Sequence, residues 1–127
     1  MRKSKPIIES CVHTEKEKFW LNDNEYYDIE EAMKIAEIYK PFKLPLKHID
    51  IFVKRWTDVE EIWHFAWHMK RALNADLNYP ILMDRTGTII NGWHRISKAL
   101  ATDLEYVMCV RIEEDLKIYK KESNEGE

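Results

Sequence analysis

The segment between residues 80 and 100 constrains the fold more than any other part of the chain. Two short apolar runs, 80–84 and 88–90, flank an Arg-Thr-Gly sequence, a pattern that predicts a β-hairpin. Asn91-Gly92 follows the second run directly, and apolar residues then recur at helical spacing as far as Leu100. We therefore expect a hairpin whose second strand passes through a glycine turn into a helix.

A helix and an edge strand are predicted before this segment. The helix begins at the N-cap Asp28, with Glu31 at capping-box spacing, and stops at Lys40-Pro41. Residues 42–47 then alternate apolar and polar side chains around an internal proline, which is typical of a strand at the edge of a sheet.

The ends of the predicted fold are also strands. Aromatic residues on either side of the turn-forming stretch 22–24 favour a short hairpin or an extended edge segment, and the apolar, β-branched run 106–112 predicts a buried strand. The resulting order, β-α-β-α-β-β-α-β, predicts an α/β or α+β domain with a small mixed sheet and about three helices.

A further helix is predicted from about Asp58 to Leu73, after a capping box of Thr57 and Glu60. Its expected core face carries Val59, Ile62, Trp63, Ala66 and Leu73. The opposite face carries the metal-competent residues Glu61, His64 and His68, which we interpret as a solvated face, with a metal site as the alternative. Trp67 lies off the apolar stripe; we expect it to pack in the core, with the lining of a pocket or contact with a partner as the alternatives.

Composition limits the classes of protein that fit the chain. With 127 residues and 45% hydrophobic content, it suffices for one domain, predicted over 1–112 with a core of about 42–112 and a charged tail at 113–127. The net charge of −3 provides no general positive field for nucleic acid, and no apolar run is long enough to cross a bilayer. The N-terminus lacks a secretory pattern, so we expect a cytoplasmic protein in which Cys11 and Cys109 are ordinary reduced thiols.

The turn from Asn91 to Arg95 is the part of the chain most suited to binding an anion. Backbone amides at the start of a helix point outward and carry the positive end of the helix dipole. Arg95, His94 and Lys98 are placed to add charged donors to the same rim. Trp93 either stacks on a ligand or packs inside its own domain. The alternative is an ordinary Asn-Gly turn beside a surface arginine.

The stretch from Tyr79 to Leu100, followed by the strand to Ile112, resembles the ParB/sulfiredoxin fold, and the resemblance covers roughly residues 44–112. It implies that Gly92, His94 and Arg95 hold nucleotide phosphates. Sulfiredoxin has its attacking cysteine at the position of Trp93, so the resemblance does not extend to reduction of cysteine sulfinic acid.

No general base is assigned by this resemblance. Serine kinases of the family tend to have an acidic residue before the glycine, where this chain has Asn91, an amide that binds but does not act as a base. Asp84 is the nearest replacement, and Asp28, Glu30 and Glu31 are replacements only if the fold brings them over.

We therefore expect a domain that binds a phosphorylated small molecule, and the favoured ligand is a nucleotide with Mg²⁺. If the protein is an enzyme, the favoured reaction is phosphoryl transfer or nucleotide hydrolysis. The alternative is a non-enzymatic module that grips a nucleic-acid phosphate or a partner protein, like the accessory factors of phages and mobile elements. A nuclease ranks third, because no cluster of carboxylates marks two metal sites. The sequence leaves open the identity of the nucleotide, the acceptor, the oligomeric state and the pathway.

Overall fold

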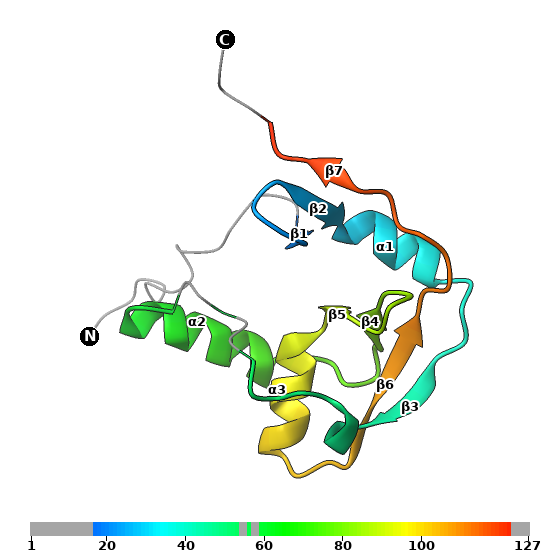
Figure 1. The fold of residues 1–127 in the computed structure, drawn as a ribbon. Coiled ribbons are helices and arrows are strands. Elements are labelled where there is room, and N and C mark those ends of the chain that lie inside the picture. Colours follow the sequence, from blue (N-terminus) through cyan, green and yellow to red (C-terminus); the bar gives the residue numbers. More distant parts are fainter. Residues whose placement is uncertain (1–16, 54–55, 57–58, 123–127) are drawn as a thin grey trace.

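The structure is a computed structural model that describes residues 17–53, 56 and 59–122 (Figure 1). A four-stranded sheet with the order β3-β6-β4-β5 lies at its centre. Its strands are β3 (Phe42–Pro45), β4 (Ile81–Met83), β5 (Ile89–Asn91) and β6 (Tyr106–Arg111). Strands β4 and β6 are parallel and the other pairs are antiparallel, so the sheet is mixed, as predicted.

Two helices cover opposite faces of this sheet, α1 (Ile29–Ala36) and α3 (Trp93–Ala101), as Figure 1 shows. Successive strand residues point to opposite faces, so neighbours such as Ile81 and Leu82 enter different core clusters. The cluster under α3 contains Leu46, Ile49, Ile81, Ile89, Ile96, Ala99, Val107 and Cys109. The cluster under α1 contains Ile29, Ala32, Ala36, Leu82, Ile90, Val110 and Ile112. The described residues thus form one compact α+β domain.

The predicted local signals of α1 and β3 are confirmed in most respects. Asp28 caps α1 by accepting a hydrogen bond from the Glu31 amide at 3.1 Å. The helix ends at Ala36 rather than at Lys40, so its last predicted turn is irregular. Strand β3 lies at the edge of the sheet with Pro45 as its last residue, where a missing amide donor costs no ladder bond.

A second, antiparallel sheet with the order β1-β2-β7 corrects the prediction of a charged tail from residue 113. The hairpin of β1 (Lys18–Trp20) and β2 (Glu25–Asp28) was expected, but β7 (Tyr119–Lys120) adds a third strand to it. Leu116 packs against the α1 core cluster, and the hydroxyl of Tyr119 donates to the Glu31 carboxylate. Part of this charged segment is therefore held on the domain, by the pairing of β7 with β2 and by the packing of Leu116 on the core cluster.

Helix α2 (Ile62–Leu73) differs most from its prediction. It begins four residues later than expected, Glu60 and Glu61 are not helical, and Thr57 and Asp58 lie outside the described residues. The packed face is also displaced from the predicted one, because Ile62 is 83% exposed and Leu73 is 69% exposed, whereas His68 is 7% exposed. Of the predicted core face, Trp63 and Ala66 are half-buried. Helix α2 lies against α3 rather than on the sheet. None of the described helices is long and apolar enough to span a bilayer.

Cys109 lies on β6 in the cluster under α3 and has no exposed surface. Burial raises the pKa of its thiol to about 11, so it stays protonated at neutral pH. The structure describes it as a free cysteine, while Cys11 lies outside the described residues.

A basic pocket at the start of helix α3

Gly92 joins β5 to α3 and is the N-cap of the helix. Its φ of +113° lies in the left-handed region, where a side chain is strained. A Cβ atom at this position would lie 2.5 Å from Cγ2 of Ile81, closer than van der Waals packing allows. The glycine is therefore required both by the turn and by the close packing of the turn on β4. As an N-cap, Gly92 offers no side-chain acceptor to the first amides of α3.

A pocket of about 450 Å³ lies between this turn and the C-terminal half of α2. Its basic side chains are Lys70 and Arg71 from α2 and His94 and Arg95 from α3, and Asp76 is its acidic one. Trp67, Asn74, Ala75, Asn91 and Gly92 complete the lining. We call this the basic pocket. Of the residues expected from sequence to bind an anion, it gathers Asn91, Gly92, His94 and Arg95.

Arg95 is the most constrained cation of the basic pocket. Its Nη1 atom donates to the carbonyl of Pro80 at 3.3 Å, which anchors the half-buried guanidinium. Burial lowers the pKa of Arg95, while the charges of Asp76 and Glu17 oppose this shift. No carboxylate in the described part of the chain lies within ion-pair distance of it. Its positive charge therefore faces the pocket without direct neutralisation.

His94 is held in place by His68. Nδ1 of His68 and Nε2 of His94 lie 2.9 Å apart, so one ring donates its N–H to the other. Trp56 stacks on both imidazoles, with ring centroids 4.6 Å from His68 and 4.8 Å from His94. The stacking and the hydrogen bond together fix the orientation of the one imidazole that lines the basic pocket.

The alternative of a metal site on α2 gains no support. The carboxylate of Glu61 accepts from the indole N–H of Trp63 at 3.1 Å, and His68 is engaged with His94. His64 instead lies against the ring of Trp63. Over residues 17–53, 56 and 59–122, no three His, Cys, Asp or Glu side chains form a group that could hold a metal ion.

Two residues expected at the site lie elsewhere. Lys98 donates from Nζ to the carbonyls of Leu73 at 3.1 Å and Ala75 at 2.8 Å, so it caps the C-terminal end of α2. Trp93 packs against the core cluster under α3 and lines neither the basic pocket nor the neighbouring groove described below. Both residues stabilise the helix pair that forms the pocket.

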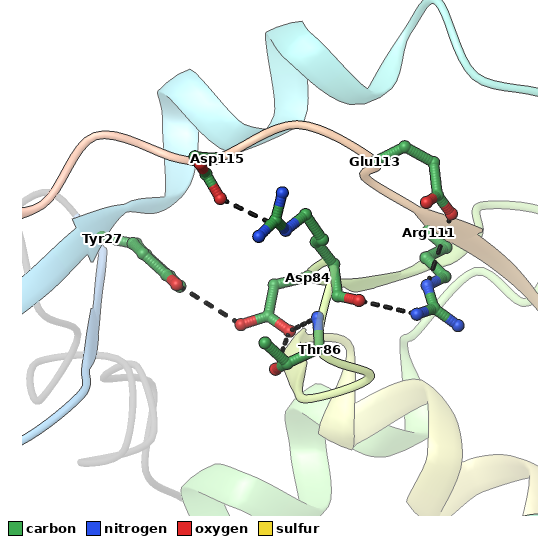
Figure 2. Close-up of polar contacts among 7 residues, drawn as sticks. Tyr27, Asp84, Thr86, Arg111, Glu113 and Asp115 are labelled. Atoms are coloured by element: carbon green, nitrogen blue, oxygen red, sulfur yellow. Dashed lines mark hydrogen bonds and ion pairs between the residues drawn. The ribbon is translucent and has the colours of Figure 1, made fainter.

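Asp84, the candidate base, is engaged in the turn between β4 and β5 (Figure 2). Its Oδ1 accepts from the amide and hydroxyl of Thr86, at 3.0 and 2.6 Å, and from the Thr88 amide at 3.0 Å. Its Oδ2 accepts from the Tyr27 hydroxyl at 3.4 Å, and burial together with this carboxylate raises the pKa of Tyr27. Asp84 is buried and lines neither cavity, so its observed role is to hold the hairpin turn. Catalysis by Asp84 stays a prediction.

A second cavity of about 580 Å³ runs between α1 and the sheet. Its lining is mainly apolar: Met33, Ala36, Tyr39, Pro41, Tyr79, Pro80, Leu82 and Val110, with Glu30, Lys34, Glu37, Asn91 and Arg95. We call this the apolar groove. Asn91 and Arg95 line both cavities, so the two are adjacent. Of the other candidate carboxylates, Glu30 reaches the groove, whereas Asp28 caps α1 and Glu31 accepts from Tyr119.

Sequence reasoning missed Lys70, Arg71, Asn74, Ala75 and Asp76 as pocket residues. The signal that could have found two of them is the spacing of Trp67, Lys70 and Asn74, which places three side chains along one side of α2. Asp76 lies beyond the helix, and its position depends on the path of the loop between α2 and β4.

Comparison with family models, curated proteins and solved structures finds no match to this chain. The functional argument therefore rests on the geometry and chemistry of the two cavities.

Proposed function

We propose that the protein binds a phosphorylated small molecule in the basic pocket, and that this ligand is a nucleotide accompanied by Mg²⁺. The observation that carries the proposal is the coincidence of three features in one cavity. The start of α3, an arginine without a carboxylate partner among the described residues, and a fixed imidazole all line it. We also propose that the domain is ParB/sulfiredoxin-like, as the resemblance of residues 79–112 implies.

The charges of the pocket favour a phosphate over a neutral ligand. Lys70, Arg71, His94 and Arg95 face a single carboxylate, and the positive end of the α3 dipole adds to them. Arg71 is partly engaged, because it lies 3.7 Å from Glu17 and 4.9 Å from the Trp67 ring. Arginine and lysine give charge-assisted hydrogen bonds to phosphate oxygens, which are stronger than neutral ones.

The size of the pocket favours a small ligand over a nucleic-acid strand. Small-molecule sites have volumes of roughly 300–1,000 Å³, and the basic pocket falls within this range at about 450 Å³. A non-enzymatic module that holds a nucleic-acid phosphate or a protein partner is the second candidate, because an exposed rim with Lys70 and Arg71 would also suit a phosphodiester backbone. A nuclease remains the third.

Mg²⁺ fits the pocket only as a companion of the phosphates. The pocket offers side-chain oxygen atoms from Asn74, Asp76 and Asn91. Mg²⁺ is commonly held by one or two carboxylates together with substrate phosphates. Phosphoryl transfer is an extension of the proposal that needs a base. Asp84 is committed to the turn, and Glu30 lines the apolar groove rather than the basic pocket, so neither is assigned this role.

The test is titration calorimetry of a panel of nucleoside triphosphates with and without Mg²⁺, for the native chain and for Arg95→Ala. A charge-assisted hydrogen bond contributes about 1.5–3 kcal/mol, so Arg95→Ala should weaken binding roughly tenfold to a hundredfold. Arg85→Ala is the matched control, because Arg85 is exposed, pairs with Asp115 at 3.3 Å and lines neither cavity.

Two results would contradict the proposal. One is nucleotide binding that Arg95→Ala leaves unchanged. The other is no nucleotide binding together with salt-sensitive binding to DNA or RNA, which would favour the second candidate.

A further inference from the structure

The apolar groove lies beside the basic pocket and is a place for the part of the ligand that is not phosphate. We infer that this ligand carries a flat heteroaromatic base and that the base lies in the apolar groove, on the far side of Arg95 from the phosphates. The inference rests on the proposed function, and it assigns a role to a cavity that phosphate binding alone leaves without one.

The floor of the groove is apolar and buried. Ala36, Leu82 and Val110 are buried members of the core cluster under α1, so their packing fixes the shape of the floor. Tyr39 lines the groove as well, and its hydroxyl donates to Glu114 at 2.8 Å. A groove with this floor favours a ligand group that is removed from water on at least one face.

The rim of the groove combines aromatic and polar side chains. Tyr79 lines the groove and is 63% exposed, and an aromatic ring of this kind can stack on a flat ligand. Glu30, Lys34 and Asn91 also line the groove, and they provide hydrogen-bond acceptors and donors. A base has an apolar face and a polar edge, and this combination matches the rim, whereas a saturated acyl chain would leave the polar groups unused.

The junction between the cavities makes one ligand sufficient for both. Asn91 and Arg95 line the groove and the basic pocket, and Arg95 is anchored to the carbonyl of Pro80, itself a groove residue. A ligand that places its phosphates against the pocket side of Arg95 therefore has its remaining part next to the groove. A nucleotide joins these two chemistries through one sugar.

The experiment compares pyrophosphate, which fills only the basic pocket, with nucleoside triphosphates and with octyl phosphate. We expect at least one nucleoside triphosphate to bind the native chain at least tenfold more tightly than pyrophosphate. Met33→Trp should reduce this ratio to near one, because Met33 lies on α1 at the groove and outside the basic pocket, and a larger ring there occupies the space for the base.

Met69→Trp is the matched control. Met33 is 48% exposed and Met69 is 47% exposed, both lie on helices, and Met69 lines neither cavity. The ratio should therefore stay at its native value in Met69→Trp, and thermal unfolding of both variants would show that they are folded.

The outcomes separate this inference from the function on which it rests. If pyrophosphate binds and depends on Arg95 but no nucleotide binds more tightly, the groove holds no base and the inference is wrong. If octyl phosphate binds as tightly as the best nucleotide and is equally weakened by Met33→Trp, the groove accepts any apolar group and the inference is also wrong. If neither pyrophosphate nor any nucleotide binds, the proposed function itself fails.

Discussion

Helices α2 and α3 meet at the basic pocket, and each is amphipathic, yet they pack in opposite ways. Ile96 and Ala99 of α3 point into the core and are almost completely buried. On α2 the apolar residues Ile62 and Leu73 are exposed, and the buried residue is His68. An apolar stripe at helical spacing therefore predicted a helix in both cases but predicted the packed face in only one of them.

The difference follows from where each helix is attached. Helix α3 follows β5 through a single glycine, so it must fold back over the sheet, and its apolar face meets the apolar face of the strands. Helix α2 is separated from its neighbouring strands by longer segments and rests on α3 through the pair of His68 and His94. It is held there by that hydrogen bond, by the stacking of Trp56 on both rings and by the bonds from Lys98 to the end of α2.

The largest expected loss of stability comes from a substitution at Gly92, which connects β5 to α3. Gly92→Ala places a Cβ atom 2.5 Å from Ile81 and a side chain at a φ of +113°. Backbone strain costs about 1–3 kcal/mol and overpacking costs about 1–3 kcal/mol, so the free energy of unfolding should fall by about 2–6 kcal/mol. Urea unfolding followed by tryptophan fluorescence measures this change.

Gly87→Ala is the control for Gly92→Ala, because it separates the two contributions. Gly87 has a φ of +92° but nothing within 4 Å of its Cβ position, so only the backbone term applies. Equal losses in the two variants would show that α3 is not packed tightly on β4.

A smaller effect is expected from the contact that holds α2. His68→Ala removes the hydrogen bond to His94 and the stacking against Trp56 and leaves a cavity. Loss of a buried hydrogen-bond partner costs about 1–3 kcal/mol, and the same variant should weaken nucleotide binding, because His94 loses its fixed orientation. His68→Asn, which keeps a polar atom near the position of Nδ1, should recover part of both losses. A His68→Ala protein with native stability and native binding would mean that α2 is held by other contacts.

The sequence predicted the central sheet, α1 and α3 well because in these elements the local signal and the tertiary contact agree. The N-cap Asp28, the edge proline Pro45 and the glycine turn at Gly92 all act through their own backbone or their nearest neighbours. The face of α2 and the strand β7 could not be predicted in the same way. His68 and Tyr119 are placed by partners 26 and 88 residues away in the sequence, and no local pattern contains that information.

The residues of the candidate site likewise fall into those that a local sequence pattern predicted and those that it did not. Asn91, Gly92, His94 and Arg95 were found because they are contiguous and lie where a strand gives way to a helix. Lys70, Asn74 and Asp76 join them only through the packing of α2 on α3. Lys98 was assigned to the ligand because of its spacing from Arg95, but the carbonyls at the end of α2 lie within its reach and use its charge.

The smallest expected effect is on the exposed face of α2, and it sharpens the comparison between the helices. Ile62→Lys replaces a side chain that is 83% exposed, so the free energy of unfolding should change by no more than about 0.5 kcal/mol. Ile96→Val, the control on α3, removes a single buried methylene group at a site that is 1% exposed and should cost about 0.5–1.5 kcal/mol. If Ile62→Lys instead cost more than Ile96→Val, the apolar stripe of α2 would be covered in solution. The apolar face of α2 that its periodicity predicts would then be packed, but against a surface other than the sheet.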